Sequence, residues 1–162
     1  MVELIAVMTI AAILAAAAVP AMTTLRAARI ESAQLMIVRD LGYARDRAVA
    51  TGTPHRVAFD VIQQQYRLML VPSGDPASQV TTSHTTPAGG EYVVRFGQNE
   101  FSGVLLVSAS LGGGASVTFD WRGTPHGAGG TPLLSGTHEV RLAGGRGVRL
   151  RAITGLAERF SY

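Results

Sequence analysis

A single carboxylate stands at the start of a long apolar stretch, and its position calls for a chemical explanation. Glu3 precedes residues 4–19, which are uncharged and contain Thr9 as their one polar side chain. Pro20 follows seventeen positions after Glu3. Insertion scales assign roughly 2.5–3.5 kcal/mol to a charged side chain at a bilayer centre, so an ionisable group beside an apolar segment indicates function. We therefore expect Glu3 to take part in what this protein does.

A second group of charged residues lies near the C-terminus. Residues 1–137 carry nine arginines and nine acidic residues, whereas residues 138–162 carry five arginines against two glutamates, which accounts for the net charge of +3. The candidate contact patch consists of Arg141, Arg146, Arg149 and Arg151. We interpret it first as a solvated strand face, then as a docking site for an acidic neighbouring subunit, and last as a site for nucleic-acid phosphates. Base stacking would need interleaved aromatic residues, and only Phe160 and Tyr162 are near.

The remaining polar residues do not form a recognisable reactive constellation. The four histidines, which share no metal-ligand spacing, are His55, His84, His126 and His138. The chain has no cysteine, so neither disulfides nor thiolate metal sites are available. No Ser/His/Asp arrangement or acid pair has a context that would make it catalytic. The sequence therefore predicts a protein that is not an enzyme and uses no metal or cofactor.

The elements that would position Glu3 begin with one long helix over residues 1–52. Its first half, residues 1–22, is apolar all round, and its second half, residues 23–52, is amphipathic. Gly52 as a C-terminal cap, followed by Pro54, ends the pattern. About 50 residues at 1.5 Å each give a rod of roughly 75 Å, in which Pro20 should cause a kink or a local loosening.

The amphipathic half predicts which face packs on the rest of the protein. The residues expected on the packing stripe are Leu35, Val38, Leu41 or Gly42, Arg45 and Ala48. The residues expected to point elsewhere are Arg39, Asp40, Asp46 and Arg47.

Residues 53–162 have the alternating pattern of short strands. The expected strands are 55–61, 65–71, 92–96, 104–108, 115–121, 138–142 and 148–153. Residues 72–90 read as a polar, Pro- and Gly-rich loop that we expect to be mobile. We predict an α+β fold in which the helix packs on an antiparallel, sandwich-like sheet domain.

The last two expected strands predict a hairpin with a defined register. A turn at residues 143–147 would place Leu142 opposite Val148 and Val140 opposite Leu150, with these apolar pairs facing inward. Arg141, Arg149 and Arg151 would then share the solvent face with one carboxylate, that of Glu139.

The first 25 residues resemble the N-terminal helix of type IV pilins and type II secretion pseudopilins. The run Val2-Glu3-Leu4-Ile5-Ala6-Val7-Met8 and the later Pro20 keep that family's spacing of a glutamate and a proline. The resemblance implies that residues 1–22 lie in the bacterial inner membrane and later assemble into a filament. It also implies that Glu3 neutralises the N-terminal amine of a neighbouring subunit.

Residues 32–155 resemble the GspH/FimT domain. The similarity rests on residues 41–52, which contain an Ala-Arg-x-x-Ala pattern and end in glycine, on residues 117–123, and on residues 148–155. The resemblance implies a minor pseudopilin of a type II secretion system, with its domain in the periplasm and with other pseudopilins and the inner-membrane assembly platform as partners. The alternative is a FimT-like minor pilin of a type IV pilus, with a possible role in DNA uptake.

The start of the chain departs from the family pattern. Members begin with a basic leader that ends in Gly and is followed by a methylated aromatic residue, whereas this sequence opens with Met1. We expect the leader, the methylation site and the cut made by a prepilin peptidase to be encoded upstream. A further alternative is a secreted β-sandwich binding module whose first 21 residues form a cleaved signal peptide. The N-terminus of the mature protein would distinguish this alternative from the pseudopilin and type IV pilin interpretations.

Overall fold

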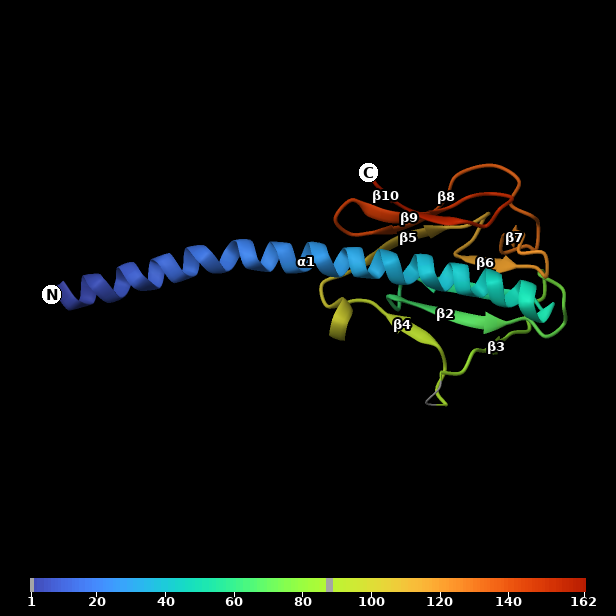
Figure 1. Ribbon diagram of the computed structural model, residues 1–162, viewed down its shortest axis with the longest axis horizontal. Helices are drawn as coiled ribbons and strands as arrows, with labels where there is room; N and C mark the ends of the chain where they lie inside the picture. The colour runs from blue at the N-terminus through green and yellow to red at the C-terminus, as the bar shows by residue number, and fades with distance from the viewer. Residues whose placement is uncertain (1, 87–88) are drawn as a thin grey trace.

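The computed structural model describes the backbone of residues 2–86 and 89–162, together with their side chains except at residues 2, 4 and 13–23. One long helix is followed by short strands and one 3-10 turn (Figure 1). In chain order the elements are α1 (Val2–Thr51), β1 (His55–Asp60), β2 (Gln65–Leu70), β3 (Thr82–Ser83), β4 (Val93–Arg95), η1 (Asn99–Phe101), β5 (Leu106–Ser110), β6 (Ser116–Phe119), β7 (Pro125–His126), β8 (His138–Leu142), β9 (Arg146–Leu150) and β10 (Ala157–Ser161).

Helix α1 ends where the sequence predicts. Gly52 has a φ of 67°, the left-handed conformation that closes a helix and that glycine adopts without a Cβ penalty. The Thr51 hydroxyl donates to the C=O of Arg47 at 2.8 Å in the last turn. The helix continues through position 20, and Figure 1 shows gentle curvature instead of a sharp kink there. The side chain of Pro20 itself lies outside those described.

The packing face of α1 differs from the predicted one. Its buried residues are Ile30, Ala33, Gln34, Ile37, Asp40, Leu41, Ala44 and Ala48, a stripe with helical spacing. Leu41 and Ala48 therefore lie as expected, but Leu35 is 51% exposed and Asp40 only 3% exposed. The prediction for these two residues was wrong because the buried stripe is rotated about the helix axis from the expected one. Asp40 is accommodated there because it has hydrogen-bond partners on the side of the first sheet.

The strands form two antiparallel sheets, which confirms the α+β class and the antiparallel sheet domain. One sheet has the order β3-β2-β1-β6-β7 with β4 also paired to β2, and the other has the order β10-β9-β8-β5. Helix α1 and both sheets contribute to one core of buried side chains. Its largest members include Tyr66, Phe96 and Phe119. Burial of each large apolar side chain contributes about 1.5–3 kcal/mol.

Of the ten strands in the described part of the chain, seven occupy predicted segments, and three were missed: β3, β7 and β10. Strands β3 and β7 have two residues each, too few to show alternation. Strand β10 alternates weakly because it is a partly exposed edge strand, with no fully buried residue.

The β8–β9 hairpin has the predicted inward face but a different register. Val140 lies opposite Val148, two positions from the predicted pairing. The turn is shorter than expected because Gly144 and Gly145 take positive φ angles of 89° and 71°. A shift by two residues preserves which side of the strand each residue faces, so the apolar residues still point inward.

Part of the predicted loop 72–90 is attached to the first sheet. It contributes β3, and the buried side chain of Arg56 donates to the C=O groups of Pro76 and Ser78 at 2.9 and 2.8 Å. The guanidinium also donates to Thr118 Oγ1 at 2.8 Å. The segment is therefore less irregular than its composition indicates, and its mobility stays a prediction.

Candidate assembly surface

The first half of α1 projects from the domain as an arm, here defined as residues 2–29 (Figure 1). Ile30 is the first buried residue of the helix among the described side chains. At 1.5 Å per residue the arm is about 40 Å long. Its role cannot be to complete the core of its own domain, because it extends beyond that core.

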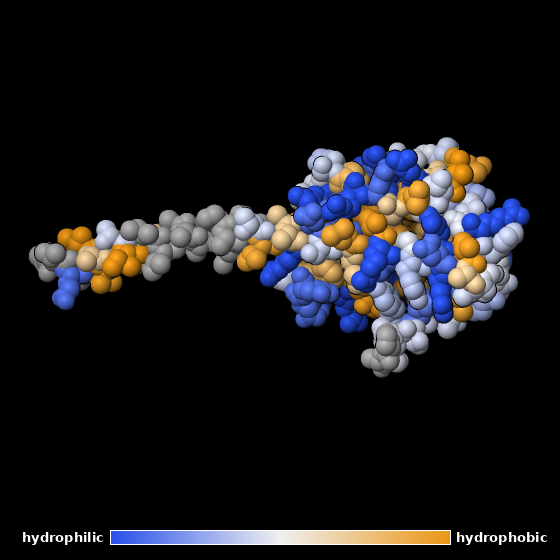
Figure 2. Space-filling model, in the orientation of Figure 1, coloured by the Kyte–Doolittle hydropathy of each residue, from blue (hydrophilic) through white to orange (hydrophobic). Residues whose placement is uncertain are grey.

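The arm exposes apolar side chains that its own chain does not cover. Ile5, Val7, Met8 and Ile10 are each 60–68% exposed. Hydrophobic surface, coloured orange, gathers at the far end of the arm (Figure 2). Exposed apolar surface of this kind marks contact with another protein or with lipid. Glu3 lies beside these residues in the first turn of α1 and is also exposed.

The polar residue inside the apolar run is satisfied within the helix. The Thr9 hydroxyl lies 2.8 Å from the C=O of Ile5 and 2.9 Å from the C=O of Ala6. A hydroxyl bonded to its own helix backbone can be placed in apolar surroundings with little penalty. Glu3 therefore remains the ionisable residue that directly precedes the apolar run of residues 4–19. Among the residues that the structure describes, no helix has an apolar stretch long enough to cross a membrane.

Two buried polar residues hold the second half of α1 on the domain. The carboxylate of Asp40 accepts hydrogen bonds from the hydroxyls of Tyr66 at 2.7 Å and Tyr92 at 2.8 Å. The side-chain amide of Gln34 donates to the C=O groups of Gly147 at 2.7 Å and Phe160 at 3.1 Å. Asp40 thus ties α1 to the first sheet and Gln34 ties it to the second. Sequence reasoning missed both, because only the fold shows that their partners exist.

The structure brings together most of the predicted arginine patch but pairs it with carboxylates. Glu139 accepts from Arg149 at 2.7 Å and from Arg141 at 3.0 Å. Arg151 binds Glu158 at 2.9 Å. Burial alone raises the pKa of Glu139, but the hydrogen bonds from Arg149 and Arg141 outweigh it, and the net pKa lies below its usual value. Glu139 therefore stays ionised between the two guanidinium groups.

The aromatic residues near the patch are also engaged. Arg141 lies over the ring of Tyr162 and Arg149 over that of Phe160, at 4.8 and 4.9 Å from the ring centres. Arg146, the fourth residue of the patch, lines a separate surface cavity together with Arg159 and Glu31. The patch is a network of ion pairs more than an open cationic surface, and contact with nucleic acid stays a prediction.

Two of the histidines that are far apart in sequence lie together. The rings of His55 and His84 have centroids 4.7 Å apart. His84 Nε2 is buried and has no hydrogen-bond partner among the described atoms. Burial lowers the pKa of both histidines, and the neighbouring Arg47 lowers each further. Within the described residues, no three His, Asp or Glu side chains are grouped so that they could hold a metal ion.

The histidine pair predicts that stability falls with acidification. Lowering the pH from about 7.5 to about 5.5 should reduce the free energy of unfolding, because the unfolded chain takes up protons that the folded pair resists. The contribution is complete above the unfolded pKa of about 6.5 and is lost as the pH falls toward the lower folded values. Urea unfolding at several pH values measures this. The His84→Phe variant should show a shallower pH dependence than wild type. Equal slopes in wild type and His84→Phe would contradict the assignment.

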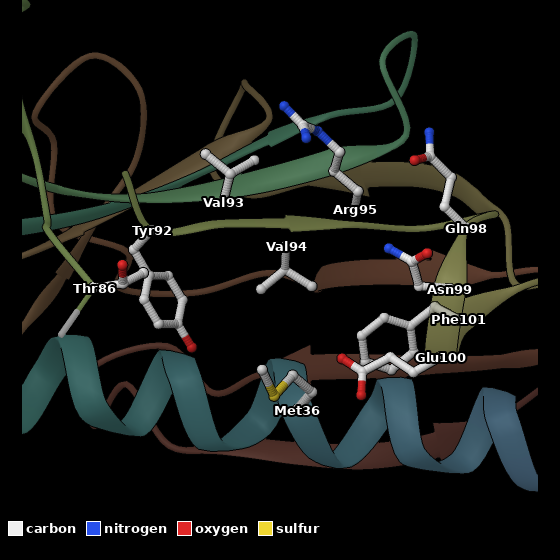
Figure 3. A pocket seen from close by; sticks show the side chains of 10 residues that line it. All are labelled: Met36, Thr86, Tyr92, Val93, Val94, Arg95, Gln98, Asn99, Glu100 and Phe101. Carbon is white, nitrogen blue, oxygen red and sulfur yellow. The ribbon is translucent and has the colours of Figure 1, made fainter. Parts of the chain in front are cut away.

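A cavity of about 320 Å³ lies between α1 and β4 (Figure 3). Val94 and Tyr92 point toward the helix, and Val93 and Arg95 point to the other side of the strand. The cavity wall also includes Met36 of α1 and the η1 residues. Its lining combines apolar side chains such as Val94 and Phe101 with polar ones such as Gln98 and Glu100.

Comparison with known proteins agrees with this architecture. The family model described as "Type II transport protein GspH" matches residues 36–155, which are 120 of the 162 residues. The structure of the minor pseudopilin EpsH from the Type 2 Secretion System of Vibrio cholerae is similar, with a TM-score of 0.55 and 11% identity over 82% of this chain and 97% of that chain. At this identity the likeness shows a shared fold. No curated protein sequence matches the chain. Because the family match spans most of its length, the chain belongs to the GspH family of type II transport proteins.

Proposed function

We propose that this protein is a minor pseudopilin of a type II secretion system, which assembles through α1 into a periplasmic pseudopilus and acts without catalysis. The observation that supports this most directly is the arm. A GspH-family domain carries a helix whose exposed apolar residues, among them Ile5, Val7 and Met8, have no cover within the described chain. Helices of this kind reach stability when equivalent helices pack around them. The partners would be other pseudopilins and the inner-membrane assembly platform.

The proposal includes a membrane-inserted stage before assembly. Residues 1–22 would be held in the inner membrane, with residues 53–162 in the periplasm. The uncharged run of residues 4–19 and the internally bonded Thr9 suit apolar surroundings. In the filament, lipid would be replaced by the helices of neighbouring subunits. A leader upstream of Met1 would bring in a prepilin peptidase.

Glu3 would provide the specific contact within this assembly. A carboxylate transferred among apolar helices loses its hydration, which is strongly unfavourable unless a positive charge lies beside it. The N-terminal amine of an adjacent subunit would supply that charge. A subunit in the wrong axial position would leave the carboxylate unpaired, so Glu3 would also set the register between neighbours.

The test compares two glutamates of the same helix. Glu3→Gln should reduce co-purification with the other pseudopilins by about tenfold or more, since a buried charge pair broken on one side costs about 3–5 kcal/mol. Membrane insertion should persist, because the neutral glutamine is easier to insert. Glu31→Gln is the matched control, because Glu31 binds Arg159 of its own chain at 2.9 Å. Crosslinking in cells and secretion of the system's exported proteins are the readouts. Normal incorporation of the Glu3→Gln subunit would overturn this role.

A further inference from the structure

We propose that the open edge of β4, together with the cavity between β4 and α1, binds an extended segment of another polypeptide that carries an acidic side chain next to Arg95. The segment would join the first sheet as an additional strand. This contact lies on the domain and not on the arm, so it does not depend on the proposed function of Glu3.

Among the residues that the structure describes, β2 pairs with one side of β4 and no strand pairs with the other side. Strand β4 pairs with β2, and the N–H of Leu68 donates to the C=O of Tyr92 at 3.2 Å at the start of this pairing. In an antiparallel ladder, hydrogen-bonded and non-bonded residues alternate along the strand. Val94 is therefore the next bonded residue, whereas Val93 and Arg95 direct their N–H and C=O groups to the open edge. Alternating donors and acceptors at this spacing are matched by another extended backbone.

The space below this edge can accept side chains of an added strand. Side chains of a strand alternate between its two faces, so every second one would point toward α1 as Val94 does (Figure 3). The cavity there has a volume of about 320 Å³. It adjoins a second cavity of about 500 Å³ over the exposed flank of α1, and the two share Met36, Glu100 and Phe101 in their walls. Leu35, exposed on that flank, adds apolar surface to the second cavity. Apolar side chains are therefore expected at the positions of the segment that face the helix.

The other face of the edge is positively charged. Arg67 of β2 lies opposite Val93, and both Arg67 and Arg95 are exposed. Neither arginine has an ion-pair partner among the residues that the structure describes. Opposite charges on neighbouring strands attract, so a carboxylate on the added strand is favoured next to Arg95. The occupant is thus an alternating apolar and polar segment with one acidic residue on its outward face.

The experiment uses the full chain in detergent micelles and a fluorescein-labelled peptide, Thr-Val-Thr-Val-Glu-Val-Thr, followed by anisotropy. Val93→Pro should weaken binding by about tenfold or more because it removes an edge N–H, and Val93→Ala should bind within about twofold of wild type because it keeps that N–H. Proline is tolerated at this position because the N–H of Val93 does not bond to β2. Substituting Lys for Glu in the peptide should weaken binding to wild type, and Arg95→Glu should restore it.

Three results would overturn the proposal: no binding of the peptide, equal affinity of Val93→Pro and Val93→Ala, or self-association of the wild type that Val93→Pro abolishes. The last would identify a second copy of the chain as the occupant. If Val93→Pro does not fold, backbone amide hydrogen exchange of the wild type, with and without the peptide, tests the proposal instead. The amides of Val93 and Arg95 should exchange more slowly with the peptide than without it, and unchanged exchange counts against the site. A Val93→Pro subunit that loses peptide binding but still enters the filament normally would show that this site acts independently of Glu3.

Discussion

Replacing Asp40 by alanine is expected to lower the free energy of unfolding by about 2–4 kcal/mol. Asp40 is 3% exposed, and its carboxylate accepts from the hydroxyls of Tyr66 and Tyr92. Without it, the hydroxyl of Tyr66, a residue with no exposed surface, loses its partner inside the core. Burial and the adjacent carboxylate raise the pKa of Tyr66 far above its usual value, so its hydroxyl is a donor at every ordinary pH. Urea unfolding at pH about 7.5 measures the loss.

Asp46→Ala is the matched control for this prediction. Asp46 is also an aspartate of α1, but its side chain is 71% exposed and binds Arg45 at 3.1 Å on the surface. Such pairs contribute about 0–1 kcal/mol, so the control should remain close to wild type. A loss below about 1 kcal/mol for Asp40→Ala would mean that the two tyrosines find water or other partners.

Replacing Arg56 by methionine is expected to cost about 1–3 kcal/mol and to expose residues 72–80 to proteolysis. Arg56 is 6% exposed, and its guanidinium supplies donors to Thr118 and to the C=O groups of Pro76 and Ser78. Methionine retains much of the apolar stem but leaves these acceptors without a donor. Proteinase K suits the measurement, because this segment contains no arginine or lysine.

Arg67→Met serves as the control for Arg56→Met. It is an arginine of the adjacent strand β2 and lies opposite Ala58 of β1, but it is exposed. Its replacement should leave unfolding and cleavage within residues 72–80 nearly unchanged. Equal cleavage rates in wild type and Arg56→Met would show that other contacts, such as those of β3, hold the segment.

The arm illustrates what local pattern can predict. Residues 4–19 are apolar, Gly52 and Pro54 stop the helix, and both features act over a few neighbouring residues. The predicted span of residues 1–52 is therefore close to the observed Val2–Thr51. The strands with clear alternation were also predicted, since alternation reports burial of one face. The shortest strands and the edge strand β10 carry too little of this signal.

Asp40 and Glu139 illustrate what local pattern cannot predict. Asp40 was expected to face away from the core, yet it is buried because Tyr66 and Tyr92 approach from strands far along the chain. Glu139 was expected to dilute a basic patch, yet it binds two arginines directly. In both cases the local sequence shows a charged residue, and only the folded chain shows its partner.

The sequence by itself determined the helix, most strands, the apolar run behind Glu3 and the resemblance to the GspH family. These follow from periodicity and from motifs of contiguous residues. Tertiary structure decided which polar residues are buried and that the arginines near the C-terminus are largely paired. It also decided that, within the described part of the chain, one edge of β4 has no partner strand and lies beside a cavity. Those properties depend on contacts between residues distant in sequence. The free energy of a buried charge or of an unpaired backbone group is set by the hydrogen-bond donors, acceptors and charges that the fold places next to it.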